Sequence, residues 1–280
     1  MAPAAPMDAN RIMFRRIFFA VCLATTLARG SVCAADWEQT VPAFAPGSFS
    51  EPRPVKLEYA FGWSGLTAAV ATARFYRSND QFVLDGKAET IGVARGLWPF
   101  DVQHISSVDA HTLRPIEVKE VERRRSKRFD THLGFTAERV MAHRIDEKKG
   151  KAKTNDKSFD FPNVMSLNSA LLYLRSKPLA NGTVERVVVY PGRAPYLCTL
   201  SVLGRERITV PAGGYDTIKL EVKLDKVGDD RELKPHKKFK SATVWLSNDP
   251  DRLIVKIEAQ IFIGSVFAEL RSAQFETPKS

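Results

Sequence analysis

Apolar and polar residues alternate with a period of two in the later part of segment 241–270, and this alternation constrains the fold more than any other feature of the sequence. A period of two is that of a β-strand with one buried face. The apolar run 244–246 and the turn-forming residues 248–251 come before it, so the segment is predicted to be a β-hairpin. The apolar face of its return strand holds Leu253, Val255, Ile257, Ala259, Ile261 and Ile263, and the polar face holds Lys256, Glu258 and Gln260.

The same pattern recurs along most of the chain. Alternating or apolar runs predict strands at 55–63, 69–77, 82–88, 102–108, 113–122, 129–135, 139–145, 184–190, 196–203, 205–210 and 218–224. Residues 91–100 contain two glycines, a proline and a tryptophan, and are predicted to form a loop or a short helical turn. The polar residues 147–157 are predicted to form a long exposed turn.

One segment has the period of a helix. Within 165–175, the apolar residues Leu167, Ala170, Leu171 and Leu174 fall at i, i+3, i+4 and i+7, which places them on one helix face. Asn163 or Ser166 is suited to cap the start of this helix. We therefore predict a mainly β protein: a strongly curved antiparallel sheet or incomplete β-barrel with one packed α-helix at about 165–175.

The N-terminus is typical of a secretory signal peptide. Three arginines precede the apolar run 17–27, and small residues follow, with cleavage expected after Ala34 or Ala35. The run is shorter than the about 18 apolar residues that a membrane span needs. We expect a signal peptide at 1–35, a Pro-rich lead-in at 36–54, a single β-rich domain at 55–273 and a polar tail at 274–280. The protein is then periplasmic or secreted, with no transmembrane span after signal removal.

The sequence contains no recognisable catalytic or metal-binding motif. Loss of residues 1–35 leaves Cys198 alone, so an internal disulfide is excluded, and Cys198 is expected to pack as a small hydrophobe. The sequence has no Gly-x-Ser-x-Gly, no His or Cys spacing that suits zinc, and no phosphate-binding loop. It therefore predicts no catalytic residue, metal or cofactor, and favours a non-enzymatic protein.

The densest positive charge lies at 123–128, in Arg123, Arg124, Arg125, Lys127 and Arg128. A solvated strand edge is the favoured interpretation, because charge on an edge blocks aggregation. Contact with an anionic lipid or glycan of the cell envelope is the other. Residues 1–35 hold four Arg and one Asp, so 38 basic and 31 acidic residues remain without them, a net charge of +7. The predicted export argues against nucleic acid as the partner of this charge.

Aromatic residues on the apolar strand faces form a second candidate feature. Most are expected to belong to the core. If the sheet curves without closing, some would line a cavity for an apolar ligand. The candidates for this lining are Tyr59, Phe61, Trp63, Trp98 and Trp245.

Residues 55–270 resemble the bacterial domain of unknown function 3108 family. The matching landmarks are 57–63 with Gly65-Leu66, Leu97-Trp98-Pro99, Leu113-Arg114-Pro115, 169–175 with Pro178-Leu179 and Gly182, 210–213, and 244–247 with Asp249. Ile254 departs from the pattern, in which a proline is common. The resemblance implies an exported, mainly antiparallel β domain. It implies no activity and no catalytic residues.

Three functional hypotheses follow. The first is an exported, non-enzymatic periplasmic or cell-envelope protein that binds a lipid or another apolar ligand in a curved-sheet cavity. The second is an envelope glycan or ester hydrolase that uses a pair of carboxylates, with candidates Asp101, Asp109, Glu117, Glu120 and Glu122. The third is a structural protein that binds its partner through an exposed sheet edge.

Overall fold

The computed structural model describes residues 36–235, 241–261 and 264–276. It contains three short helices and one sheet of fifteen strands. The helices are α1 (Asp36–Gln39), α2 (Gly92–Leu97) and α3 (Leu167–Arg175). The strands are β1 (Val55–Trp63), β2 (Leu66–Ser78), β3 (Gln81–Thr90), β4 (Phe100–Asp109), β5 (Pro115–Arg124), β6 (Lys127–Phe135), β7 (Arg139–Lys148), β8 (Lys151–Asp160), β9 (Val184–Val189), β10 (Tyr196–Val210), β11 (Gly213–Val227), β12 (Leu233–Pro235), β13 (Ala242–Ser247), β14 (Ile254–Ile261) and β15 (Gly264–Phe275).

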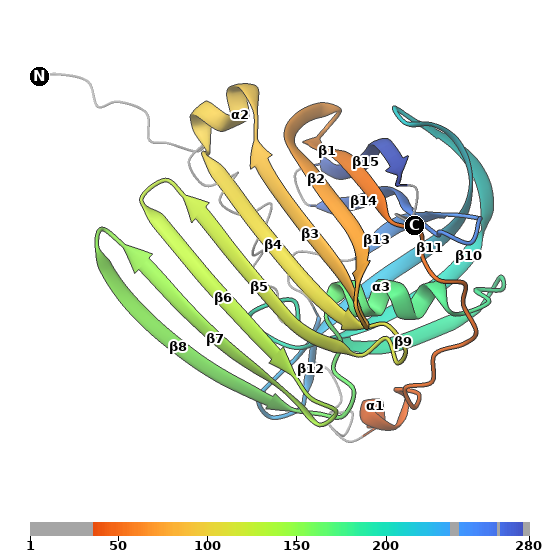
Figure 1. Ribbon diagram of the computed structural model, residues 1–280, viewed down its shortest axis with the longest axis horizontal. Coiled ribbons are helices and arrows are strands. Elements are labelled where there is room, and N and C mark those ends of the chain that lie inside the picture. Colours follow the sequence, from red (N-terminus) through yellow and green to blue (C-terminus); the bar gives the residue numbers. More distant parts are fainter. Residues whose placement is uncertain (1–35, 236–240, 262–263, 277–280) are drawn as a thin grey trace, which may run out of the picture.

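The sheet consists of two antiparallel meanders. They are joined by pairing between β1, the first strand of the chain, and β15, the last. The strand order is β8-β7-β6-β5-β4-β3-β2-β1-β15-β14-β13-β11-β10-β9, and β12 pairs with β11 outside this path. Strands β8 and β9 end the order and do not pair with each other, so the sheet is open (Figure 1). The predicted fold class, a curved antiparallel sheet that does not close into a barrel, is confirmed.

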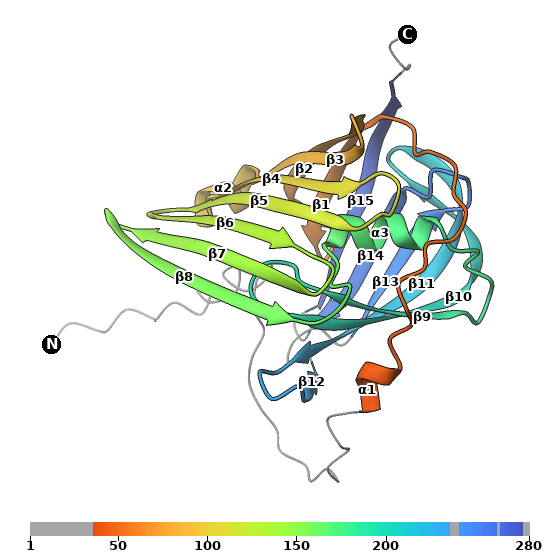
Figure 2. The ribbon, with the colours of Figure 1, turned by 60° about the horizontal axis from the view of Figure 1, so that its bottom comes forward.

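The sheet curves so strongly that β9 and β10 lie inside the curve (Figure 2). On one face of these strands, Val188 and Leu197 belong to a cluster with Leu133 and Val140 of β6 and β7. On their other face, Val187 and other apolar side chains pack against α3. Two buried layers therefore fill this end of the curve, one on each side of β9 and β10.

Helix α3 lies in the concave side of the sheet, and Ser166 caps it by accepting a hydrogen bond from the amide of Ser169. The predicted position and cap are confirmed, but one residue of the predicted buried face is wrong, because Leu167 is 59% exposed. Leu172 and Tyr173, which the helical pattern did not select, are at most 2% exposed. The helix is covered both by β9 and β10 and by the strands around β1, so its buried surface is wider than a single stripe.

The predicted hairpin at 241–270 contains three strands. Its turn is as predicted: Oδ1 of Asp249 accepts hydrogen bonds from the amides of Asp251 and Arg252. The return strand, however, ends at Ile261, and the chain folds back as β15, which pairs with both β14 and β1. The predicted position of Ile263 on that strand lies outside the described residues. The segment is therefore the link that joins the two meanders.

The prediction of a long exposed turn at 147–157 is wrong. The chain turns at Lys149 and Gly150, which have positive φ, and then forms β8 along β7. Nearly all side chains of β8 are exposed, because an edge strand with solvent on both faces requires no apolar alternation. The period-of-two signal is therefore missing from this strand.

The Pro-rich lead-in packs on the domain. The indole of Trp37 stacks on Phe161, with ring centroids 5.5 Å apart, and donates a hydrogen bond to the carbonyl of Arg231. Further along, the amide of Gly47 donates to the hydroxyl of Ser176 at the end of α3. These contacts fasten the lead-in to both buried layers, and so it is not a free tether.

Candidate functional site

The concave face of the central strands carries an aromatic row beside a row of small residues. On β1, Tyr59, Phe61 and Trp63 point to this face at alternate positions. The register places Ala71 beside Tyr59, and Ala88 of β3 beside Ala71. Ala71 and Ala88 are the small side chains of this row, and the neighbouring aromatic rings form a wall at one side.

This part of the concave face is not packed like the rest. Where α3 covers the sheet, Val55, Phe75 and Phe82 are at most 4% exposed. Further along the same strands, several inward apolar side chains are only half-buried, although Ala69 and Ala268, which flank Phe61 in register, are 5% and 6% exposed. We call these residues the concave surface: Tyr59, Phe61, Trp63, Ala71, Ala73, Ala88, Val102, Ile257 and Val266. Tyr59 and Ala73 lie at its border and also pack against the buried cluster under α3.

A polar flank adjoins the concave surface on β4 to β7. The Nδ1 atom of His104 lies 3.1 Å from Oε2 of Glu120, its partner in register. Glu122, which is 2% exposed, forms an ion pair with Arg124, and burial raises the pKa of the Glu122 carboxyl. The inner face therefore changes from apolar to charged between β3 and β5.

Arginine side chains gather around one ring of this polar flank. The guanidinium of Arg144 lies 4.5 Å from the ring centroid of Phe129, and donates hydrogen bonds to Thr131 and Asp146. The guanidinium of Arg193, from the loop between β9 and β10, lies 5.7 Å from the same ring. Burial and the nearby positive charge of Arg144 lower the pKa of Arg193. The cluster is a region where buried positive charge is concentrated.

Two of the predicted lining residues lie elsewhere. Trp245 faces the opposite side of the sheet from Val244 and Leu246, beneath Lys219 and Lys256, and its indole donates a 2.6 Å hydrogen bond to Glu206. Trp98 ends α2 at the rim of the sheet, where the guanidinium of Arg125 lies 5.9 Å from its ring. Of the five predicted residues, Tyr59, Phe61 and Trp63 are brought together.

The basic run 123–128 does not form one surface. The side chains of Arg123, Arg125 and Arg128 are exposed, whereas Arg124 points inward and forms an ion pair with Glu122. Strand alternation is the cause, since neighbouring residues point to opposite faces. The exposed members extend across the β5–β6 turn, where Lys127 of β6 pairs with Lys148 of β7.

The candidate carboxylates are also divided by the sheet. Glu120 and Glu122 lie on the concave side, in the polar flank described above. Asp101 and Glu117 lie on the other face, bonded to Arg95 and to Lys119. Asp109 accepts hydrogen bonds from the amides of His111 and Thr112, which lower the pKa of its carboxyl and fix the β4–β5 turn.

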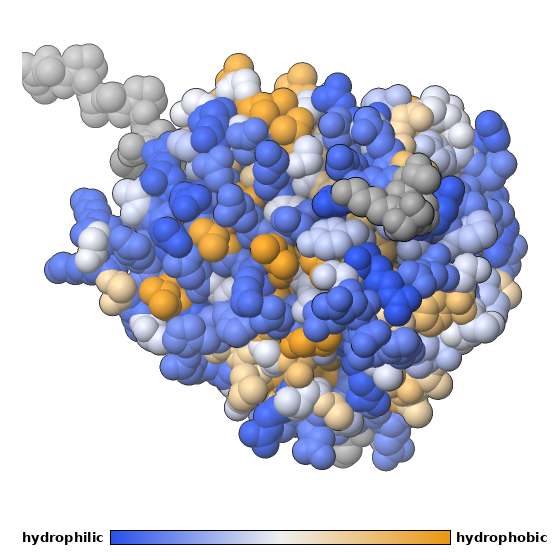
Figure 3. All heavy atoms as spheres, in the orientation of Figure 1, coloured by the Kyte–Doolittle hydropathy of each residue, from blue (hydrophilic) through white to orange (hydrophobic). Residues whose placement is uncertain are grey.

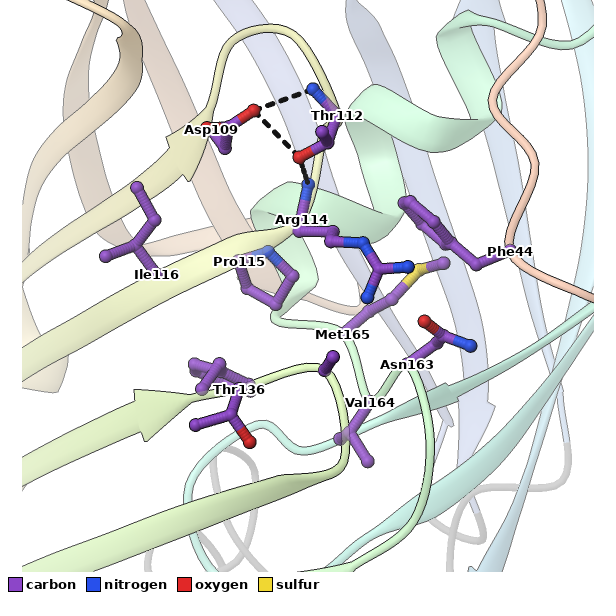
Figure 4. Close-up of a pocket in the computed structure, with 12 residues that line it drawn as sticks. Phe44, Asp109, Thr112, Arg114, Pro115, Ile116, Thr136, Asn163, Val164 and Met165 are labelled. Atoms are coloured by element: carbon purple, nitrogen blue, oxygen red, sulfur yellow. Dashed lines mark hydrogen bonds between the residues drawn. The ribbon is translucent and has the colours of Figure 1, made fainter.

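A pocket of about 220 Å³ opens at the far end of the sheet from α2 (Figure 4). It lies between the β4–β5 turn, the β6–β7 turn and the segment before α3, and the Arg114 side chain extends into it toward Phe44, with 5.1 Å between guanidinium and ring. A second hollow, of about 260 Å³, lies on the convex face of β2 to β5 among Lys87, Glu89 and Arg123. Sequence reasoning singled out neither hollow as a site, because each is assembled from turns or strands that are distant in the chain.

Among the described residues, no group of His, Cys, Asp and Glu side chains is arranged to hold a metal ion. The search for a membrane span covered the same residues and found no helix with the length and apolarity to cross a bilayer.

Two comparisons with known proteins carry information. A family model described as a protein of unknown function (DUF3108) matches residues 58–271. A crystal structure from Brucella abortus, of a β-barrel-like protein of the domain of unknown function DUF1849, is similar in fold, with a TM-score of 0.55. The two sequences are 11% identical, and the match covers 81% of this chain and 99% of that one.

Two further structures match with TM-scores too low to support an argument. One is a presumed exported protein from Bacteroides fragilis, with a TM-score of 0.36 and 8% identity over 82% of this chain and all of that one. The other is a presumed lipoprotein from Parabacteroides distasonis, with a TM-score of 0.32 and 9% identity over 81% of this chain and 97% of that one. No curated protein matches the chain.

Proposed function

Because this chain belongs to the DUF3108 family of proteins of unknown function, we propose its function from its geometry: it is an exported, non-enzymatic envelope protein that holds the apolar chain of a lipid on its concave surface. One observation supports this proposal most. Phe61, Trp63, Ala88 and Val102 on the inner face of the central strands are half-buried, while Val55, Phe75 and Phe82 under α3 are at most 4% exposed. An apolar surface inside a curved sheet gains free energy when an apolar ligand covers it.

The chemistry of the surface favours a chain-like ligand. We infer a shallow path along Ala71, Ala73 and Ala88, whose side chains are small, with Phe61 and Trp63 at its side. The polar flank at β4 to β7 would lie at one end of that path and suits the head group of an amphiphile. A fatty acid or phospholipid combines these two parts.

A fluorescent long-chain fatty acid tests the proposal. The wild-type protein is expected to bind it in a saturable manner, and native mass spectrometry after mild extraction is expected to show a co-purifying lipid. Ala71→Trp fills the path and is expected to weaken probe binding by about tenfold, which is the effect of losing about 60 Å² of apolar contact.

The matched control is Thr72→Trp, which places the same ring on the convex face one residue away. This variant is expected to bind the probe like the wild type. Equal affinity of the two Trp variants, or repeated recovery of the wild type without lipid and without probe binding, would contradict the proposal. Circular dichroism of both variants establishes that each is folded.

Residues 1–35 support the proposed location, because their basic and apolar pattern is typical of a secretory signal. The partners of the protein in the cell envelope would be lipids or anionic envelope components, not nucleic acid. Export of a fusion to a reporter that is active only outside the cytoplasm tests this point. A reporter that stays inactive with residues 1–35 present would contradict it.

A hydrolase that uses carboxylates is the second candidate, because one observation favours it. Glu122 is buried on the concave side, its pKa is raised by burial, and Glu120 lies two residues away on the same face. Several hydrolases pair a carboxyl group of raised pKa with a second carboxyl group. Hydrolysis of esters or glycans by the wild type and its loss in Glu122→Gln would support this candidate over simple binding.

A further inference from the structure

An exposed apolar group lies at the end of the sheet that carries α2. Val93 and Leu97 of α2 are 81% and 58% exposed, and Leu66 at the start of β2 is 70% exposed. Helix α2 packs against β2 and β3, and the amide of Ile91 donates a hydrogen bond to the carbonyl of Ala68. The three side chains therefore belong to one rim, which we call the α2 rim: Leu66, Val93 and Leu97.

Antiparallel register brings two basic turns to the same end. Thr90, which precedes α2, pairs with Ala69 of β2, and Phe100, which follows α2, pairs with Arg124 at the end of β5. The β5–β6 turn thus lies beside α2, and the β7–β8 turn follows because Lys127 pairs with Lys148. Exposed basic residues of these turns are Arg123, Arg125, Lys148, Lys149 and Lys151.

The basic turn is bonded directly to α2. Nη2 of Arg125 donates a 2.6 Å hydrogen bond to the carbonyl of Leu97, and its guanidinium lies near the Trp98 ring. Figure 3 shows hydrophobic atoms along the upper border of this face, where Figure 1 places α2 and the β1–β2 turn, with hydrophilic atoms around them. Apolar side chains and positive charge are therefore held together on one rim.

We propose that the α2 rim docks on the surface of a membrane that contains anionic lipid. Exposed Leu and Val side chains would enter the boundary between head groups and acyl chains, and the basic turns would face the head groups. The charge selects this occupant, because a basic border complements anionic lipid. The proposal is separate from ligand binding on the concave surface, since neither set of residues includes the other.

Vesicle co-sedimentation tests the proposal with the full chain. Vesicles of phosphatidylcholine mixed with phosphatidylglycerol are expected to bind the wild type at least about tenfold more tightly than phosphatidylcholine alone, because each basic residue near the surface adds attraction. The double variant Val93→Ser, Leu97→Ser is expected to bind the mixed vesicles about tenfold more weakly, because it loses two apolar side chains. The double variant Lys148→Glu, Lys149→Glu is expected to lose the preference for the anionic lipid.

The matched control is Leu167→Ser, Leu203→Ser, which removes two side chains of similar exposure, 59% and 54%, away from the rim. It is expected to bind like the wild type. Failure of the wild type to bind either vesicle, equal binding to both vesicles, or equal loss in control and rim variants would overturn the proposal. The fatty-acid titration is expected to be unchanged in the rim variants. A failure of membrane docking can therefore be distinguished from a failure of ligand binding on the concave surface.

Discussion

The hydroxyl of Ser169 in α3 donates a 2.7 Å hydrogen bond to the carbonyl of Leu113 in the β4–β5 turn. Both residues are 0% exposed, and Leu113 has a φ of 58°, a left-handed conformation that is uncommon for a residue with a branched side chain. The bond joins the buried helix to a turn 56 residues away in the sequence. It therefore helps to fix both the helix position and an unfavourable backbone conformation.

Replacement of this hydroxyl is expected to destabilise the protein. Ser169→Ala leaves the buried carbonyl of Leu113 without its partner, which costs about 1–3 kcal/mol in free energy of unfolding. Urea unfolding followed by circular dichroism measures the loss. The control Ser158→Ala removes an exposed hydroxyl on the edge strand β8 and is expected to change the free energy of unfolding by less than about 0.5 kcal/mol. Equal effects of the two changes would contradict the structural role of the bond.

Cys198 is expected to be unreactive in the folded protein. Burial raises the pKa of its thiol from 9.0 to about 12, so the nucleophilic thiolate is scarce at neutral pH. A chain with Cys22→Ser and Cys33→Ser isolates this thiol. A chromogenic disulfide reagent is expected to label it only as the protein unfolds, with complete labelling in denaturant. Rapid stoichiometric labelling without denaturant would contradict the predicted burial.

The same thiol gives a pH dependence of stability. Because its pKa is higher in the folded than in the unfolded chain, ionisation favours unfolding. Its contribution to the free energy of unfolding is complete below about pH 9 and is lost as the pH rises toward 12. Cys198→Ala is expected to remove this part of the alkaline decline, which urea unfolding at several pH values can measure.

The period of two predicted the strands with one buried face, and these include β1, β3 and β4, which carry much of the concave surface. It missed β8 because both faces of that strand are in solvent. The helical spacing placed α3 correctly but misjudged Leu167, since a helix covered from two sides has no single apolar stripe. The errors arise where burial departs from the pattern of one buried face.

The candidate site was predictable only in part. Tyr59, Phe61 and Trp63 share a strand, so their common face follows from alternation alone. Trp245 also lies on an apolar strand, but its ring lies beneath the ammonium groups of Lys219 and Lys256 on the convex face. Long lysine side chains can bury an aromatic ring at the surface, and no sequence pattern distinguishes that ring from a core residue.

Processing of the N-terminus can be measured directly. The exported protein is expected to begin at Ala35 or Asp36, since small residues precede each bond. Intact-mass measurement of the protein from the envelope fraction gives the cleavage site. Ala34→Arg together with Ala35→Arg is expected to block cleavage and to leave the longer chain in the membrane fraction. An unprocessed wild-type chain would contradict the prediction.

The lysines of β8 are expected to keep the sheet edge from associating. Lys151, Lys153 and Lys157 are exposed on this edge strand, where unpaired backbone groups could bind another strand. Replacement of all three by Val is expected to produce dimers or aggregates, which light scattering after size-exclusion chromatography detects. The control Lys119→Val, on the internal strand β5, is expected to remain in the wild-type state of association. A monomeric triple variant would show that the positive charge of these lysines does not prevent association of the sheet edge.

Trp245 and Trp63 are expected to differ in what their loss affects. Trp245→Phe removes the hydrogen bond to Glu206 on the convex face, at a cost of about 1 kcal/mol in free energy of unfolding, because the carboxylate is exposed to solvent. Fatty-acid binding is expected to be unchanged, since the ring and the concave surface lie on opposite faces of the sheet. Trp63→Ala removes part of the aromatic wall and is expected to weaken probe binding by about tenfold. Weaker binding by Trp245→Phe to the same degree would mean that the probe does not occupy the concave surface.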